Sequence, residues 1–438
     1  MTAMSIRTVS LLGLALSLPL VANEALDILE GRKALDEVEL PPAPEGEAGE
    51  EGIAGDEVTF ERPEWAPSPL DPIWSRAILF DDPDNPWIQQ LAVMGMVHFG
   101  ASWGTAEVEG ARDVELDTTR TRRARLGARL KVFGNTEIEA IGEFAGDADY
   151  QRLERLKART QVLPNHYVEF GKFRPRFGIE QSTDPQRLLT PERTLLANML
   201  MPASTLGVVF GQDCAPWDWS VGWFSGDNDR YFPGIEGNGF IAANLAYEMD
   251  ERLGESRAMR TRWHLDYIYN MDGRKSESLP RYDLAGRTAS NGNQAIRFNP
   301  SFRHLMSTGI QLEGECFTFD GDFVIAHGDS KAWGMTLTPS YWAVPGMLRI
   351  VGRYHYADTD DPAGLVGGLG VGSDPFYDAS PVFVGDEFHS FYLGANVHLY
   401  QDRMVLLNGL EYAIMKDDAG AGFETDGWIW HTGARVSF

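Results

Sequence analysis

The sequence predicts an all-β protein, a transmembrane antiparallel up-and-down β-barrel of about sixteen strands. Three observations predict it. An export signal stands at the N-terminus, with no later apolar run long enough for a membrane helix. From Ile88 onward, short segments alternate apolar and polar residues with a period of two. The connections between these segments are mostly short and long in turn, as in barrels with short turns on one side of the membrane.

The first 22 residues read as a secretory signal peptide. Arg7 precedes an apolar run from Val9 to Val21, and small Ala22 is followed by polar Asn23, which predicts cleavage after Ala22. The run is too short for a comfortable transmembrane helix, and no later stretch supplies about 18 to 20 consecutive apolar residues. The mature protein is therefore either soluble and exported or embedded in a membrane as a barrel.

Residues 23–87 are interpreted as an acidic periplasmic segment. The spacing of apolar residues in Glu24–Val38 predicts a short helix, and Pro41–Gly55 is too rich in Pro, Gly, Ala and Glu to bury a core, which predicts a disordered linker. Residues 23–64 hold fourteen acidic and three basic residues and so carry −11 of the chain's net −26; residues 65–438 retain −16. So acidic a chain argues against nucleic acid as a partner.

Residues 88–438 are predicted to form the barrel itself. The last segment shows the pattern best, because Trp428, Trp430 and Val436 share one face while His431 and Arg435 share the other. The sixteen predicted strands are 89–104, 120–133, 136–145, 152–163, 166–174, 205–212, 217–225, 239–249, 257–270, 306–319, 322–327, 332–342, 347–357, 387–399, 403–415 and 428–438.

The predicted connections support closure. Seven are short, and the connections between them are mostly long, including 105–119, 175–204, 271–305 and 358–386. An even number of strands with the short turns on one side leaves both chain ends in the periplasm. Closure also removes the exposed strand edges that lipid cannot satisfy. The seven predicted short turns are 134–135, 164–165, 213–216, 250–256, 320–321, 343–346 and 400–402.

Four motifs and the last residue carry a resemblance to a known family. The motifs are an RRAR strand, a GKF-x-x-x-FG strand end, an ER pair in a loop and an LGV strand, found at Arg122–Arg125, Gly171–Gly178, Glu192–Arg193 and Leu206–Val208. Residues 120–211, which contain them, are similar to the phosphate-selective porin O and P family. Terminal Phe438 resembles the end signal of outer-membrane barrels generally.

The resemblance implies a sixteen-stranded trimeric barrel in the bacterial outer membrane, with one loop folded into the pore. The matching loop is Arg176–Ala203. Within it, Thr190 before Pro191 predicts the N-cap of a helix over Pro191–Met201.

Basic side chains on the predicted inner face are the candidate functional residues. A charge on the lipid side of a strand costs about 2 to 4 kcal/mol near the midplane, so the charged face of a spanning strand must turn inward. Rings of Arg or Lys favour anions, and the planar fork of Arg suits phosphate. The candidate pore-lining and anion-binding residues are Arg123, Arg125, Arg129, Lys131, Lys172, Arg174, Arg187, Arg193, Arg260, Arg262, Arg349, Arg353 and Arg435.

A purely structural role is the alternative for the strand residues. Porins carry lumen charges merely to keep the pore wet, and Glu137, Glu139 and Glu143 also share a face. Arginines and glutamates on facing strands would then pair across the sheet.

The loop residues have alternatives of the same kind. Arg187, Glu192 and Arg193 either narrow the pore or form a salt bridge within the loop. Lys172 and Arg174 stand near the strand end before the loop, where they either guide anions or anchor lipid headgroups.

Neither a cofactor nor a metal is expected. His98, His264, His355 and His431 stand singly in strands without metal-ligand spacing. No GxSxG elbow or Walker loop appears, so an enzyme is not expected, although a hydrolase whose Ser and His meet only in the folded chain stays open. Cys214 and Cys316 are interpreted as structural or incidental.

The leading hypothesis is passive diffusion of small anions, phosphate or related oxyanions, through an arginine-lined pore. The expected partners are these solutes, outer-membrane lipid and lipopolysaccharide, and two further copies of the chain in a homotrimer. The rival pore is general or cation-preferring, favoured by the net −16 and the inner glutamates. A different class is a structural or adhesive surface barrel with a blocked lumen.

Overall fold

The computed structural model describes residues 70–108, 113–144, 150–200, 202, 204–226, 232–235, 238–252, 258–271, 302–360, 364–368, 382–417 and 424–438. Every described residue belongs to one compact unit. The predicted signal peptide, residues 1–22, lies outside the described residues, as do the helix and linker predicted in residues 24–55.

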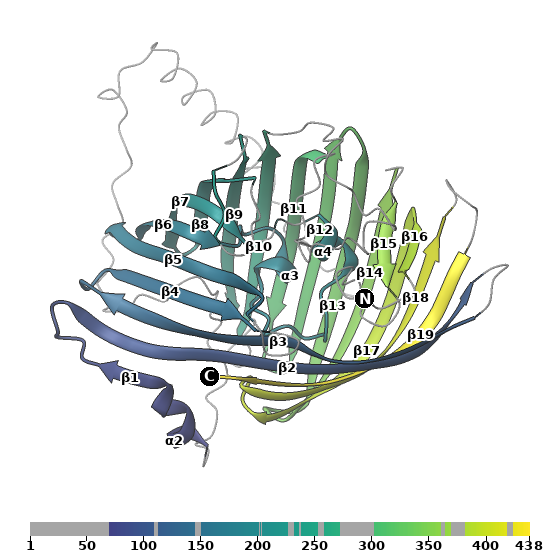
Figure 1. Ribbon diagram of the computed structural model, residues 1–438, viewed down its shortest axis with the longest axis horizontal. Coiled ribbons are helices and arrows are strands. Elements are labelled where there is room, and N and C mark those ends of the chain that lie inside the picture. Colours follow the sequence, from purple (N-terminus) through teal and green to yellow (C-terminus); the bar gives the residue numbers. More distant parts are fainter. Residues whose placement is uncertain are drawn as a thin grey trace, which may run out of the picture. The chain divides into compact units, whose positions relative to one another are not determined.

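Sixteen antiparallel strands of the described chain form a closed barrel (Figure 1). Each strand pairs with its neighbours in chain order, and the last one pairs with the first. The predicted fold class and strand number are thus confirmed. The strands are β2 (Ile88–Val108), β3 (Val114–Val132), β4 (Thr136–Glu143), β5 (Arg152–Leu163), β6 (His166–Phe173), β7 (Thr205–Cys214), β8 (Trp217–Phe224), β9 (Phe240–Arg252), β10 (Ala258–Asn270), β11 (Phe302–Glu313), β12 (Phe317–Gly328), β13 (Lys331–Val344), β14 (Leu348–Thr359), β17 (Glu387–Tyr400), β18 (Met404–Lys416) and β19 (Glu424–Ser437).

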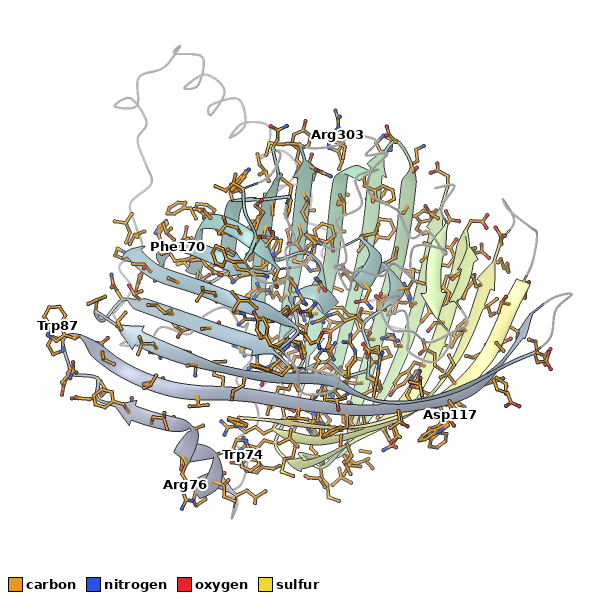
Figure 2. All side chains as sticks on the ribbon, viewed as in Figure 1. Trp74, Arg76, Trp87, Asp117, Phe170 and Arg303 are labelled. Carbon is orange, nitrogen blue, oxygen red and sulfur yellow. The ribbon has the colours of Figure 1, made fainter. Side chains whose placement is uncertain are left out.

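The outer face of the barrel is apolar and the inner face is polar, as the period-two pattern predicts. In β19, Trp428 and Trp430 are 54% and 51% exposed, whereas His431 and Arg435 are only 3% exposed each. Phe170 of β6, labelled in Figure 2, is likewise exposed. Exposed aromatic and aliphatic side chains around the wall suit contact with lipid hydrocarbon. Among the described residues, no helix is long and apolar enough to cross a membrane.

One predicted turn is wrong. The sequence Asp320-Gly321 reads as a hairpin turn, but it lies inside β12, and the chain turns instead after β11, which ends at Glu313. Asp320 and Asp322 continue the inner-face alternation of β12, and Gly321 between them is covered by the ring of Phe319. Two inward carboxylates separated by one outward residue fit a strand, so the wider alternation overrides the turn signal.

The other boundary differences are smaller. The predicted loop over residues 105–119 is shorter, because β2 continues to Val108 and β3 begins at Val114. Within the predicted connection 358–386, the short strands β15 (Leu365–Gly368) and β16 (Val382–Gly385) pair as a two-stranded ribbon.

A short N-terminal segment extends the wall at the end of the barrel that carries the short turns. It consists of α2 (Asp71–Trp74), the 3₁₀ turn η2 (Ser75–Ala77) and β1 (Ile78–Asp81). β1 pairs with β2 at positions 90–92, just beyond the last pairing of β19 with β2 at Met96. It therefore covers an edge of β2 that the C-terminus leaves open (Figure 1). Trp74 fixes the segment by donating from Nε1 to the carbonyl oxygen of Ser437 at 2.6 Å.

Candidate functional site

The connection between β6 and β7, residues 174–204, folds into the barrel and is called the inward loop below (Figure 1). It contains two helices of about one turn, α3 (Ile179–Ser182) and α4 (Leu195–Met199). The predicted inward loop is thus present, but the helix predicted over residues 191–201 is shorter and its N-cap is Thr194. The hydroxyl of Thr190 donates instead to the Glu192 carbonyl at 2.8 Å, in a turn around Pro191.

Apolar packing holds the inward loop inside the lumen. Phe177 and Leu195 are fully buried, and Leu200 is only 1% exposed. They belong to one cluster with inward side chains of the far wall, among them Ile268 of β10 and Leu305 of β11. The loop therefore fills the part of the lumen beside β10–β13. Its docking is stabilised because the packing removes apolar surface from water.

Polar side chains of six strands also bind the backbone of the loop. Asp266 and Asp322 accept from the backbone N–H groups of Gly178 and Ile179 at 2.7 and 2.8 Å. The other four strands donate to loop carbonyl groups. The wall residues that hold the loop backbone are Asn244 of β9, Asp266 of β10, Asp322 of β12, Arg353 of β14, Asn396 of β17 and Arg435 of β19.

Three of the candidate pore-lining arginines donate hydrogen bonds to the backbone of this loop. Arg435 donates to the carbonyl groups of Pro185 and Leu188 at 2.7 and 2.9 Å. Arg353 donates to the carbonyl of Glu192 at 2.7 Å. Arg193 lies in the loop and donates to the loop's own backbone. Each is at most 5% exposed, so these three guanidinium groups stabilise the position of the inward loop.

A bulge in β3 brings further arginines to the inner face. His98 of β2 pairs with Arg123, but the next residue, Phe99, pairs with Thr121, so Arg122 is the extra residue. A bulge of this kind changes which residues point to each face. Arg120, Arg122 and Arg123 consequently all reach the inward loop.

These three arginines converge on one carboxylate of the loop, that of Glu192. Arg122 donates from Nε to Oε1, Arg120 Nη2 lies 3.2 Å from Oε1, and Arg123 Nη2 lies 3.7 Å from Oε2. The side chain of Glu192 is 8% exposed. Despite this burial, the nearby arginines hold the pKa of Glu192 well below its usual value. Because the folded pKa is lowered, these ion pairs stabilise the docked loop at neutral pH, and they are lost only as the pH falls through that lowered pKa.

A second three-arginine cluster lies on the wall, around Glu154 of β5. Its carboxylate lies 2.9 Å from Arg125 Nη2, 2.9 Å from Arg152 Nε and 3.2 Å from Arg174 Nη2. A bulge between β4 and β5 at this point turns Glu154 inward. Two predicted site residues, Arg125 and Arg174, are thus paired with a wall carboxylate, and Arg125 also donates to Glu143.

Arg129 and Lys131 are the predicted residues with the most freedom. Both are half-buried on the inner face of β3, opposite Glu139 and Glu137 in register. Glu139 pairs with Arg155 at 2.7 Å instead. Within the described part of the chain, neither Arg129 nor Lys131 forms a hydrogen bond or an ion pair within 4 Å, and Nε of Arg129 is buried without a partner.

The remaining predicted residues are dispersed around the barrel. Lys172 of β6 is buried at 2%. Arg262 of β10 pairs with Glu248 at 3.0 Å, and Arg260 is half-buried on the same strand. Arg349 of β14 donates to two hydroxyl groups. Arg260, Arg262 and Arg349 thus lie on β10 and β14, separate from the arginines of β3.

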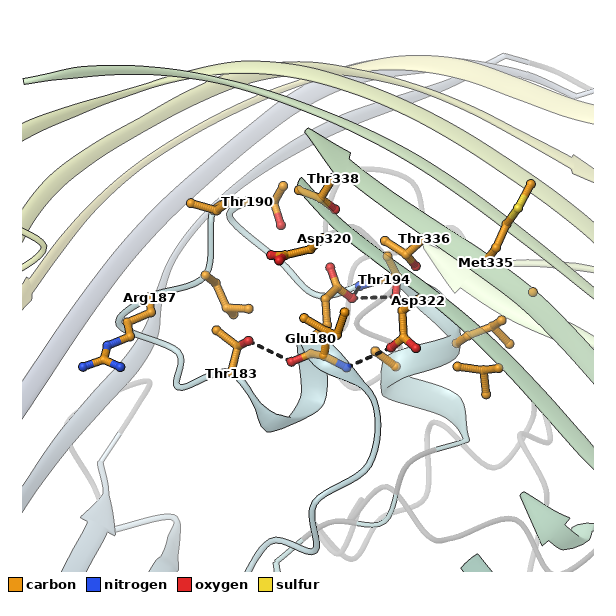
Figure 3. Close-up of a pocket in the computed structure, with 17 residues that line it drawn as sticks. Glu180, Thr183, Arg187, Thr190, Thr194, Asp320, Asp322, Met335, Thr336 and Thr338 are labelled. Carbon is orange, nitrogen blue, oxygen red and sulfur yellow. Dashed lines mark hydrogen bonds between the residues drawn. The ribbon is translucent and has the colours of Figure 1, made fainter. Parts of the chain in front are cut away.

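An acidic corner lies opposite the basic wall, at a small cavity of about 50 Å³ between the loop and β12–β13 (Figure 3). Glu180, Asp320 and Asp322 line it together with threonine hydroxyls. Glu180 accepts from both the N–H and the hydroxyl of Thr194, the N-cap residue of α4, at 2.7 and 2.6 Å. Arg187 lines the same cavity.

A Ser, a His and a Glu do meet in the folded chain. Ser102 Oγ lies 2.9 Å from His431 Nδ1, and His431 Nε2 lies 3.0 Å from Glu411 Oε2. All three are buried at 7% or less and none lines the cavity at the loop. Glu411 also accepts from Arg353 at 3.4 Å. We interpret this row as support for the loop-binding Arg353, because Glu411 joins it to His431.

The sequence alone missed Arg120, Arg122 and Glu154 as inner-face residues. A strict period of two cannot place Arg120 and Arg123 on the same face. The signal was present in the pattern itself, because basic residues at both parities of one strand, as in residues 120–125, cannot all avoid lipid unless the strand contains a bulge.

Comparison with known families supports the resemblance found in the motifs. Residues 98–236 match the family model of phosphate-selective porins O and P. The matched region runs from β2 to the connection after β8 and includes the basic wall and the inward loop. No curated protein sequence matches the chain significantly.

Several solved structures resemble this chain at low sequence identity. An anion-selective porin from Comamonas acidovorans is 13% identical, covers 80% of this chain and 99% of its own, and has a TM-score of 0.48. OprB of Pseudomonas putida is 12% identical, with coverages of 79% and 94% and a TM-score of 0.48. The outer-membrane channel DcaP of Acinetobacter baumannii is 12% identical, with coverages of 80% and 97% and a TM-score of 0.46.

Proposed function

We propose that this outer-membrane porin lets small anions, phosphate or related oxyanions, diffuse passively through its lumen along one strongly basic wall. The protein resides in the bacterial outer membrane, as the family match and the closed barrel indicate, and these favour a channel over an enzyme. A homotrimer in contact with lipopolysaccharide is part of the same proposal. It is supported by the motif resemblance and by the apolar outer face.

The charge balance of one wall carries the proposal. Among the buried and half-buried residues of β3–β6, eleven are basic and five are acidic, an excess of six positive charges. An excess of this kind along a lumen raises the local concentration of anions and repels cations. The basic residues are Arg120, Arg122, Arg123, Arg125, Arg129, Lys131, Arg152, Arg155, Lys157, Arg159 and Lys172.

The rival, a cation-preferring pore, also has an observation in its favour. Glu180, Asp320 and Asp322 stand on the opposite side of the inward loop. All three already accept hydrogen bonds, Glu180 from Thr194, Asp320 from Gln311 and Asp322 from the loop backbone. We therefore assign the selectivity to the basic wall.

The deciding experiment is the reversal potential of the purified full-length protein in a planar bilayer under a salt gradient. We expect its sign to show a preference for anions. A cation preference would assign the selectivity to the acidic corner, and absence of any conductance would favour a structural or adhesive barrel.

Arg129→Glu is expected to weaken the anion preference strongly. It reverses a charge that has no ion pair to break in the described residues, so the wall should stay intact. A change of two charge units about 7 Å from a permeating ion is worth about 1.2 kcal/mol in a water-like dielectric. The added negative charge opposes anions and favours cations. The ratio of anion to cation permeability should therefore fall by roughly ten-fold or more at low salt, where screening is weak. Arg129→Gln should give an intermediate value; an unchanged ratio in both would contradict a role for this residue.

A further inference from the structure

The contact between Glu192 and β3 has the chemistry of an occupied anion site. Guanidinium groups from Arg120, Arg122 and Arg123 surround one carboxylate, and their side chains are only 14%, 12% and 4% exposed. Arginine forks are suited to carboxylate and phosphate oxygens, to which they donate pairs of strong hydrogen bonds. The group that occupies the site here belongs to the chain itself.

The side chain of Glu192 is anchored separately from its backbone. The carbonyl oxygen of Glu192 accepts from Arg353 Nη1 at 2.7 Å and from the hydroxyl of Thr190 at 2.8 Å. Arg353 belongs to β14, whereas the arginines that bind the carboxylate belong to β3. The carboxylate can therefore leave β3 by rotation of its own side-chain bonds while the loop backbone stays bound to β14.

We propose that Arg120, Arg122 and Arg123 form a binding site for a small oxyanion, a carboxylate or a phosphate, and that the carboxylate of Glu192 is a tethered competitor for it. A permeating anion displaces Glu192 from the arginines, and Glu192 returns when the anion moves on. The inference rests on the proposed function, because it concerns the same basic wall, and it adds a regulated step to passage through it.

The tether sets which solutes bind. A short flexible tether gives a competing group an effective concentration on the order of millimolar. A solute must exceed this concentration or engage the arginines through several oxygens at once. Oxyanions do the latter and chloride does not, so the competition favours oxyanions over halides of the same charge.

The test is the dependence of conductance on anion concentration for wild-type protein and for Glu192→Gln in planar bilayers. Inorganic phosphate and acetate are the probes, and chloride gives the baseline. Without the charged competitor, the concentration of phosphate at half-saturation is expected to fall about ten-fold or more. If the half-saturating concentration falls for acetate as well, the site binds oxyanions in general. If it falls for phosphate alone, the site is specific for phosphate.

Glu154→Gln is the matched control. Glu154 also meets three arginines, Arg125, Arg152 and Arg174, but it stands on a strand. Both variants remove one negative charge that contacts arginines of the lumen, so both should raise the anion preference in the reversal potential. Only Glu192→Gln should change the half-saturating phosphate concentration by more than about two-fold. Equal changes of the half-saturating concentration in the two variants would mean that only the electrostatic potential of the lumen has changed, and this would overturn the proposal.

Two checks make the result decisive. Glu192→Asp keeps the charge and the fold, and its half-saturating concentration should lie between those of wild type and Glu192→Gln. If wild type shows no anion preference, the proposed function fails. If wild type prefers anions and Glu192→Gln leaves half-saturation unchanged, only the competition by Glu192 fails.

Discussion

Replacement of Arg353 by methionine is expected to release the inward loop and to raise single-channel conductance several-fold. Arg353 joins the loop to the wall, since it donates to the Glu192 carbonyl and the Thr190 hydroxyl and pairs with Glu411 at 3.4 Å. Its removal leaves Glu411 buried with one charge partner fewer. Loss of one partner from a buried ion pair costs on the order of 3 kcal/mol, and one-turn helices contribute little that would offset it.

Arg349→Met is the matched control for this prediction. Arg349 lies four residues earlier on the same strand and the same inner face, but it donates to the hydroxyls of Ser340 and Thr318 and not to the loop. Limited proteolysis within residues 174–204 should accompany the conductance rise in Arg353→Met and should be absent in Arg349→Met. Equal conductance and equal protease resistance in the two variants would show that Arg353 does not hold the loop.

The barrel was predictable from sequence because lipid imposes a simple rule on every strand. A charge facing hydrocarbon is costly, so alternation, strand number and the fold class follow from the residues alone. The rule also gave the correct inner face to Arg123, Arg262 and Arg435, which are buried at 9% or less. At Asp320-Gly321 the same rule prevails over a local turn signal, because the alternation runs through both residues inside β12.

The roles of the inner residues were not predictable in the same way. Alternation tells which face a side chain occupies, but not what lies opposite in a folded lumen. Alternation places Arg353 and Arg435 on the inner face but does not indicate their hydrogen bonds to the inward loop, whose path depends on contacts with strands far away in sequence. The bulge at Arg122 likewise depends on the register of pairing with the preceding strand β2, and it shifts the face of every residue beyond it.

Gly171→Ala is expected to cost the barrel on the order of 4 kcal/mol of stability, a large effect for a single methyl group. Gly171 has a φ of +126°, which L side chains rarely adopt. An added Cβ would stand 2.2 Å from the carbonyl oxygen of Leu156 and 2.9 Å from the Cα of Lys157, both backbone atoms of the paired strand β5. Neither atom can move without separating β5 from β6.

The same backbone requirement accounts for the two glycines of the GKF-x-x-x-FG motif. The segment GKFRPRFG, residues 171–178, begins at Gly171 and ends at Gly178, which has a φ of +68° where the chain enters α3. Both glycines are required by the backbone that delivers the inward loop. The temperature at which the folded barrel loses its resistance to SDS should fall by roughly 10 °C in Gly171→Ala.

Gly100→Ala provides the comparison, because the nearest atom to its added Cβ is the Thr432 carbonyl oxygen at 3.9 Å. It should leave the transition within about 2 °C of wild type, since ordinary strand substitutions change stability little. If Gly171→Ala were as stable as Gly100→Ala, the close approach of β5 and β6 would not constrain this position. The glycine at position 171 would then have to be explained by contacts with the permeating solute.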